Sequence, residues 1–352
     1  MITGAATATV NRIPVLLLPG DSFSSRQPDP VLQQIETPWD HTINANSAFK
    51  PVSRYWDRIE RPEQLMVAAL NALRVLTDPV ETGAATLCLP QDTQAEAYDY
   101  PDYFLAKRIW HIDRRPLNSR SLREATSLLS KAKKPLIIAG GGVHYSQAAD
   151  TLRDFAETFG IPVGETQAGK SAMSWKDSMS VGAIGVTGTS AANLIASDAD
   201  VVLVVGSRLQ DFTTASKQIF SPEVKLLHLN VSQYDGHKMD STALQADAKS
   251  GLQSLKESLQ TGSYQTGLEY RERISQLQSE WNVEVDRLYQ LTSEEGNVQT
   301  LIVGALNEFM APEDVVLCAA GSLPGDLHRL WRSELPKSYH MEYGYSCMGY
   351  EV

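Results

Sequence analysis

Pro135-Leu-Ile-Ile-Ala-Gly-Gly-Gly142 joins an apolar run of strand length directly to three glycines. A second run of the same kind, Val201-Val-Leu-Val-Val205, leads into Gly206-Ser-Arg. Apolar runs of four to six residues recur along the chain, bounded by Gly, Pro or Asp and separated by segments of helical periodicity. This alternation is the sequence sign of a parallel sheet covered by helices. We therefore predict an α/β fold with parallel sheets flanked by helices.

Further strands are expected at five other apolar runs, namely residues 13–18, 86–89, 161–163, 225–229 and 315–318. Helices are expected at residues 62–77, 121–132, 146–159, 190–197, 248–259 and 268–289. In the first of these, Leu65, Ala69, Leu73 and Leu76 fall on one helical face. Residues 94–120 have little periodicity and suggest a linker, and 260–297 suggest a second, helical connector. Both ends look cut, so we expect an internal fragment of a longer protein.

Composition excludes several classes of protein. The 352 residues carry 31 Lys and Arg against 42 Asp and Glu, which argues against a nucleic-acid partner. No apolar stretch approaches the roughly 20 residues of a membrane span. The three cysteines are odd in number and far apart, so they predict no disulfide framework and favour a reducing, cytoplasmic compartment.

Two glycine-rich strings match nucleotide-binding patterns in part. Residues 164–171, Gly-Glu-Thr-Gln-Ala-Gly-Lys-Ser, satisfy the pattern of a phosphate-binding loop, but the residues after Ser171 make a poor helix. The run from Gly140 to Gly142 lacks the third glycine of a dinucleotide fingerprint, which would fall at Tyr145. A tight strand-to-helix turn is the preferred interpretation of these three glycines. A phosphate-loop nucleotide-binding protein stays open as an alternative function.

Longer strings follow one another in a fixed order: Gly83-Ala-Ala-Thr-Leu-Cys-Leu-Pro90, Lys134-Pro-Leu-Ile-Ile-Ala-Gly-Gly-Gly142, Gly185-Val-Thr-Gly188 and Ala199-Asp-Val-Val-Leu-Val-Val-Gly-Ser-Arg208. In this order they resemble thiamine-diphosphate enzymes of the acetolactate-synthase superfamily. The resemblance implies three modules. Residues 1–112 would be the C-terminal part of a pyrimidine-binding domain, 113–262 a central Rossmann-like domain, 263–297 a connecting helix, and 298–352 the start of a diphosphate-binding domain.

The most distinctive strings are Lys50-Pro-Val-Ser-Arg-Tyr-Trp-Asp-Arg58 and Ala320-Gly-Ser-Leu-Pro-Gly-Asp-Leu-His-Arg-Leu-Trp331. They resemble the branch of this superfamily that hydrolyses a C–C bond in a cyclic 1,2-diketone during myo-inositol degradation. The resemblance implies a small polyol-derived diketone as substrate and a homodimer or homotetramer as the assembly. A carboligase like acetolactate synthase is the alternative within the superfamily, although its Gly-Gln-His loop is replaced here by Gly321-Ser-Leu323. A non-catalytic scaffold is an alternative from another class.

The resemblance also implies site residues. Gly321, Ser322 and Leu323 would contact the diphosphate of the cofactor, and Ser346 and Met348 would contact its aminopyrimidine ring. Asp21, Arg26 and Gln27 follow a strand and are our candidates for binding substrate hydroxyl groups. The Gly-Asp-Gly…Asn motif that holds Mg²⁺ in the family has no match here, so we expect the metal ligands beyond residue 352. The glutamate that activates the cofactor is expected upstream of Met1.

Overall fold

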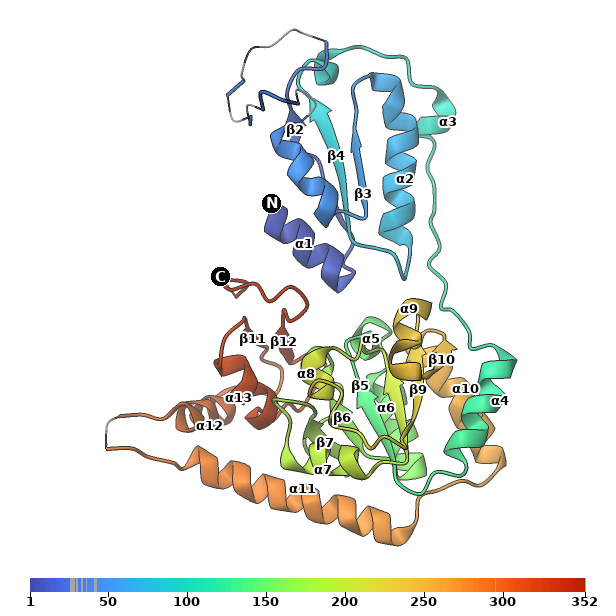
Figure 1. Ribbon diagram of the computed structural model, residues 1–352, viewed down its shortest axis with the longest axis vertical. Coiled ribbons are helices and arrows are strands. Elements are labelled where there is room, and N and C mark those ends of the chain that lie inside the picture. Colours follow the sequence, from blue (N-terminus) through green and yellow to red (C-terminus); the bar gives the residue numbers. More distant parts are fainter. Residues whose placement is uncertain are drawn as a thin grey trace. The chain divides into compact units, whose positions relative to one another are not determined.

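The computed structural model describes residues 1–25, 29, 31, 32, 34, 35, 37–40, 43–294 and 296–351. The chain divides into two compact units, Met1–Asp113 and Arg114–Val352. In each unit parallel strands are flanked by helices (Figure 1), which confirms the predicted α/β class. No helix of the described residues is long and apolar enough to cross a membrane.

Unit 1 is organised around β4 (Ala84–Pro90), which is buried along almost its whole length. Its partners all run parallel to it and are β1 (Val15–Leu17), β2 (Gly20–Asp21) and β3 (Tyr55–Arg58). Helix α2 (Leu65–Thr77) packs against β4 through the buried Ala68 and Ala72, with Leu65 and Leu76 partly buried beside them. Of the predicted apolar face, Leu65 and Leu76 belong to this cluster, whereas Ala69 and Leu73 do not. The remaining elements of the unit are α1 (Ile2–Asn11), η1 (Ala45–Val52), η2 (Pro62–Gln64), η3 (Thr93–Ala95) and α3 (Asp102–Leu105).

Unit 2 contains a six-stranded sheet in the order β10-β9-β8-β5-β6-β7, with all neighbours parallel. Its strands are β5 (Pro135–Ala139), β6 (Val163–Glu165), β7 (Ser180–Ala183), β8 (Val201–Val205), β9 (Lys225–Asn230) and β10 (Thr242–Gln245). The strand order reverses between β5 and β8, which is the pattern of a doubly wound fold. Strands β5 and β8 begin and end at the residues that the sequence predicts.

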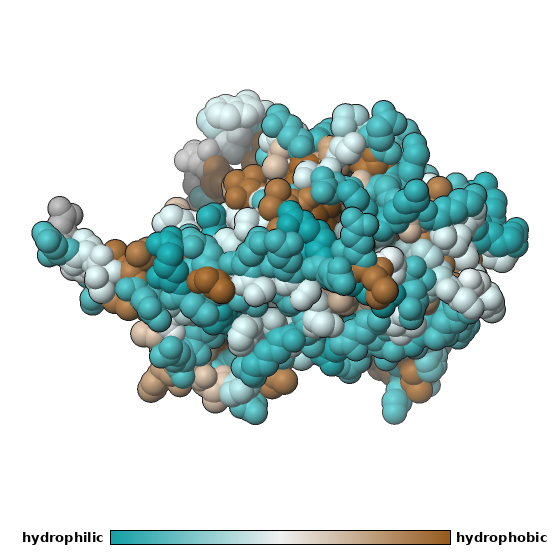
Figure 2. Space-filling model, turned by 90° about the horizontal axis from the view of Figure 1, so that it is seen from below, coloured by the Kyte–Doolittle hydropathy of each residue, from teal (hydrophilic) through white to brown (hydrophobic). Residues whose placement is uncertain are grey.

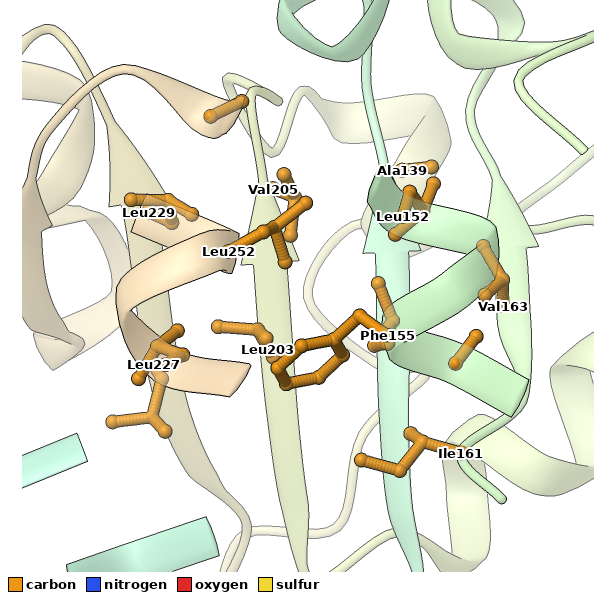
Figure 3. Packing of buried hydrophobic residues seen from close by; sticks show 14 of the residues in the cluster. Ala139, Leu152, Phe155, Ile161, Val163, Leu203, Val205, Leu227, Leu229 and Leu252 are labelled. Atoms are coloured by element: carbon orange, nitrogen blue, oxygen red, sulfur yellow. The ribbon is translucent and has the colours of Figure 1, made fainter. Parts of the chain in front are cut away.

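Alternate residues of the central strands belong to two separate cores. Ile137 and Ala139 of β5 join the cluster that also holds Phe155 and Leu252 (Figure 3). Leu136 and Ile138 belong to the cluster on the opposite face. Because side chains alternate across a strand, a uniformly apolar run fills both cores at once.

Helices cover both faces of this sheet. The helices on the face shown in Figure 3 are α4 (Ser119–Leu129), α6 (Ala149–Phe159) and α10 (Ala248–Thr261). The opposite face is covered by α7 (Ser190–Asp198) and α11 (Leu268–Tyr289). The view from the α11 side shows a mostly hydrophilic surface (Figure 2). Shorter elements at the loops are α5 (Gly142–Tyr145), η4 (Gln167–Gly169), α8 (Asp211–Thr214), α9 (Gln233–Gly236) and η5 (Lys238–Asp240).

A second, small sheet follows α11 and α12 (Gln299–Phe309). It consists of β11 (Val316–Cys318) and β12 (Tyr339–Met341), which pair in parallel, with α13 (Leu323–Leu330) between them in the chain. The sequence predicted β11 within one residue but neither β12 nor α13. The strand expected at 161–163 is displaced, because β6 begins at Val163 and includes the charged Glu165.

Candidate functional site

The loop after β11 begins the candidate cofactor site. Gly321 has φ +139°, a backbone conformation that side chains rarely adopt, and a Cβ built there would have no atom within 4 Å. Gly321, Ser322 and Leu323 are all exposed, and α13 starts at Leu323. The first backbone N–H groups of a helix have no partner within the helix and favour anions. An open glycine followed by a helix N-terminus therefore fits a diphosphate group.

The other two candidate cofactor residues follow β12. Cys318 of β11 pairs with Met341 of β12 in parallel register, so the segments after the two strands leave the same edge of the sheet. Ser346 has φ +58° and Met348 is 84% exposed. The buried Glu342 carboxylate shapes this turn by accepting hydrogen bonds from the N–H groups of Tyr345 (2.7 Å) and Cys347 (2.9 Å). The five candidate cofactor residues are thus exposed at one edge.

In unit 1, Asp21 is engaged with its own unit. Its buried carboxylate accepts hydrogen bonds from Arg58 Nε (2.8 Å), Asn44 Nδ2 (3.2 Å) and the Ser22 N–H (2.8 Å). These contacts fix the start of the loop after β2. The other two substrate candidates, Arg26 and Gln27, lie outside the described residues.

Asp92, which follows β4, fixes the same loop of unit 1. Its carboxylate accepts hydrogen bonds from the N–H groups of Ser24 and Ser25 and from the Ser25 hydroxyl (2.6 Å). Burial acts to raise the pKa of Asp92, but these hydrogen bonds outweigh it and hold the pKa well below its usual range. Because β2 and β4 are parallel, Asp21 at the end of β2 and Asp92 after β4 lie at one edge of the sheet.

Behind the candidate cofactor loop lies a buried polar cluster that sequence reasoning missed. It joins three residues of the β6–η4 segment, Glu165, Gln167 and Lys170, to His328 of α13 and Tyr339 of β12. Tyr339 donates a hydrogen bond from its hydroxyl to Gln167 Oε1 (2.9 Å), and the Lys170 ammonium lies 5.6 Å from the centre of the Tyr339 ring. All five side chains are buried.

Burial shifts the pKa values in this cluster in the direction that favours the uncharged form of each side chain. It raises the pKa of Glu165 to about 7, although the positive charge of Lys170 opposes this shift. It lowers the pKa of Lys170 to about 8, against the attraction of Glu165. The pKa of His328 falls to about 3, first through burial and then through the charge of Lys170, so its imidazole is neutral at neutral pH. Desolvation of the charged forms explains all three directions.

A cavity of about 40 Å³ adjoins this cluster and is lined by Glu165, Lys170, Arg332 and Ser333, among others. Nε of Arg332 and Oγ of Ser333 are buried and have no hydrogen-bond partner among the described residues. A polar cavity of this volume is large enough for a water molecule, which is the usual partner of such buried atoms. Within the same described residues, no group of three or more His, Cys, Asp or Glu side chains is arranged to hold a metal ion.

The two nucleotide-binding strings have structural explanations. The string 164–171 forms the end of β6 and a single 3₁₀ turn, and Lys170 points into the interior with 5% exposure. A Cβ at Gly140 would lie 2.5 Å from the Gly206 carbonyl oxygen, and one at Gly142 would lie 2.6 Å from the Gly206 Cα. Glycine is required there because two loops approach closely. The geometry lacks the helix and the accessible lysine of a phosphate loop.

Comparison with known proteins agrees with this picture. Residues 122–255 match the family model described as the central domain of thiamine pyrophosphate enzymes. Residues 122–255 are thus similar to the central domain of thiamine pyrophosphate enzymes. The match confirms the resemblance seen in the sequence, and it supports thiamine diphosphate as the cofactor of the family.

The chain is also similar from end to end to curated proteins of two bacteria. Proteins of Clostridium tetani (strain Massachusetts / E88) and Bacillus cereus (strain AH820) are 49% and 50% identical to it over 377 residues. Both are named 3D-(3,5/4)-trihydroxycyclohexane-1,2-dione hydrolase. The alignment covers 100% of this chain and 58% of the length of each relative.

Proposed function

We propose that this chain is part of an enzyme that hydrolyses a C–C bond of 3D-(3,5/4)-trihydroxycyclohexane-1,2-dione and so opens its ring to 5-deoxyglucuronate. The observation that carries this proposal is the end-to-end similarity, at about half identical residues, to proteins named as that hydrolase. The same names favour the hydrolase over a carboligase. The proposed place of action is the cytoplasm, in myo-inositol degradation.

The proposed modules follow the family pattern. Residues 1–112 belong to a pyrimidine-binding domain, 113–262 to the central domain, 263–297 to a connector and 298–352 to the start of a diphosphate-binding domain. The proposed assembly is a homodimer or homotetramer. Mg²⁺ would be held by residues outside this chain.

Thiamine diphosphate, when bound, supplies the electron sink that C–C cleavage next to a carbonyl group needs. The chain's own residues would bind and orient it. The N–H groups around Gly321, Ser322 and Leu323 would receive the diphosphate, since they are exposed beside a glycine with open space around it. Ser346 and Met348, at the same sheet edge, would contact the aminopyrimidine ring.

For the substrate, we propose a polar environment after β2, contributed by Asp21, Arg26 and Gln27. A diketone with several hydroxyl groups needs hydrogen-bond donors and acceptors on many sides. Since the Asp21 side chain is buried and its carboxylate already accepts from Arg58, Asn44 and Ser22, its proposed role is to fix this loop.

The test is the Gly321→Val substitution in the full-length protein. A branched side chain at φ +139° forces the backbone to change and turns the N–H groups away from the anion. Loss of one hydrogen bond to a charged group predicts roughly tenfold weaker binding of thiamine diphosphate, measured by calorimetry. Ring opening of the diketone, followed by product analysis, tests the reaction itself.

Gly296→Val is the matched control. Gly296 has φ +137° and, like Gly321, has open space around its Cβ position, but it lies between α11 and α12. The control should bind thiamine diphosphate as the unchanged protein does. Equal affinity of both variants would contradict the assignment of the diphosphate loop, and absence of ring opening by the unchanged protein would contradict the proposed function.

A further inference from the structure

Helix α13, which begins at the candidate diphosphate loop, packs against α12 and is also hydrogen-bonded to the central domain. Gln167 of η4 donates a hydrogen bond from Nε2 to the carbonyl oxygen of Pro324 (2.9 Å), in the first turn of α13. The other end of the same amide accepts the hydroxyl hydrogen of Tyr339 (2.9 Å). Gln167 is buried, and both of its polar ends are occupied. Its position relative to α13 is therefore fixed on two sides.

A second connection lies one turn further along α13. The His328 ring, which is 1% exposed, contacts the carbonyl oxygen of Glu165 through Nε2 (3.0 Å) and the Thr187 hydroxyl through Nδ1 (2.8 Å). A neutral imidazole satisfies both contacts if Nε2 carries the hydrogen and Nδ1 accepts from Thr187. A Cβ at Gly325 would lie only 3.1 Å from Thr187 Cγ2, so the helix approaches the central domain closely here.

The small sheet offers much less support to this helix. Its two strands have three residues each, and Leu317 in the middle of β11 is 44% exposed. Parallel sheets are ordinarily covered on both faces, and a pair of short strands is at most marginally stable by itself.

Leu327 and Leu330 of α13 also pack in one apolar cluster with α11 and α12. The first turn of α13 is hydrogen-bonded on two sides, to Gln167 of the central domain and, through Asp326, to Gln299 of α12. The bond from Gln167 to Pro324 is therefore one of the contacts that set the direction of the first N–H groups of α13.

We propose that Gln167 is a positioning residue for the diphosphate loop: through Pro324 it sets the orientation in which residues 321–323 present their N–H groups to the anion. This inference rests on the proposed function and adds a residue from a different domain to its site. The proposal also assigns a role to residues 164–171. Lys170 of this segment is buried, whereas Gln167 is hydrogen-bonded to Pro324 of α13.

The test compares Gln167→Leu with Gln278→Leu in the full-length protein. Leucine is close to glutamine in size but removes both hydrogen bonds of Gln167. Gln278 is a matched control, because its Nε2 also donates to backbone carbonyls, those of Asp177 (2.9 Å) and Ser180 (2.8 Å), but on the α11 side of the domain. Hydrogen exchange of the α13 amides and calorimetric affinity for thiamine diphosphate are measured on each.

We expect Gln167→Leu to speed exchange of the α13 amides and to weaken cofactor affinity by about fivefold, the factor for one lost hydrogen bond. Gln278→Leu should change neither. Tyr339→Phe, which frees the acceptor end of Gln167 but keeps its bond to Pro324, should show a smaller change in the same direction. It also keeps the test decisive if Gln167→Leu fails to fold.

The outcomes separate this inference from the function beneath it. Unchanged cofactor affinity in Gln167→Leu, beside weakened affinity in Gly321→Val, overturns the positioning role alone. Equal exchange of the α13 amides in the Gln167 and Gln278 variants also overturns it. If the unchanged full-length protein binds no thiamine diphosphate, the proposed function fails and the positioning role fails with it.

Discussion

The two sheets of unit 2 are stabilised in different ways. The six-stranded sheet is covered by helices on both faces, and its strands supply apolar side chains to two cores. The two-stranded sheet of β11 and β12 has a smaller cluster, and its neighbour α13 is tied to the central domain through buried polar side chains. The first arrangement depends on apolar area removed from water, whereas the second combines a smaller apolar cluster with buried hydrogen bonds that must all be satisfied.

The largest effect should come from breaking the first arrangement. Phe155 of α6 is completely buried against the six-stranded sheet (Figure 3). Phe155→Ala removes its contacts and leaves a cavity, so the free energy of unfolding of unit 2 should fall by about 3–5 kcal/mol. Denaturant unfolding measures this loss. A cost below about 1 kcal/mol would show that the core can collapse around the missing ring.

The second arrangement should respond to pH. The pKa of His328 falls from 6.5 to about 3 on folding, so the unfolded chain binds a proton that the folded chain rejects. The contribution of the neutral His328 ring to the free energy of unfolding is complete above pH 6.5 and is lost as the pH falls toward 3. Relative to His328→Gln, the unchanged chain should lose about 2 kcal/mol of unfolding free energy between pH 7 and pH 5.

Unfolding of both proteins in urea at a series of pH values provides this comparison. Glu165 is present in both, so its own titration largely cancels from the difference. A difference that is constant with pH would contradict a neutral, buried imidazole and would place the ring in contact with water.

The smallest effect should come from the outer surface of α12. Phe309 is 86% exposed and lies beside Ile302 and Leu306 on an apolar face of this helix. In the chain of 352 residues, Phe309→Ala should change the unfolding free energy by less than about 0.5 kcal/mol, as for other exposed positions. It is the matched counterpart of Phe155→Ala. A loss above about 1 kcal/mol would mean that this face is covered in solution.

This contrast also explains what the sequence could predict. β5 and β8 were predicted to the residue because they are buried on both faces, and such strands are uninterrupted apolar runs. β12, Tyr-His-Met, and β7, Ser-Val-Gly-Ala, were missed because polar and small residues hide short strands. β6 was displaced because it ends in Glu165, a buried carboxylate that looks like a surface residue in sequence.

The site was predictable only in part for the same reason. The open glycine at Gly321 was found through a long string shared with a family, and the structure places it at an exposed loop. The cluster of Glu165, Lys170 and His328 gave no such signal, because nothing in a sequence marks a charged residue as buried. One sign was available: Lys170 matched a phosphate-loop pattern without the helix that the pattern needs.

The hydrogen bond from Tyr339 to Gln167 joins residues 172 positions apart, which bears on the order in which a growing chain acquires its structure. During synthesis β5 gains its neighbour β6 early, since only the short helices α5 and α6 separate them, but α13 and β12 emerge only after the whole central sheet. Contacts between distant parts of a chain form late because closing the intervening loop costs entropy. The part of the central sheet that contacts the candidate diphosphate loop is therefore complete long before the loop itself is made. In a nascent chain the Gln167 amide gains its partner Pro324 first and its partner Tyr339 last.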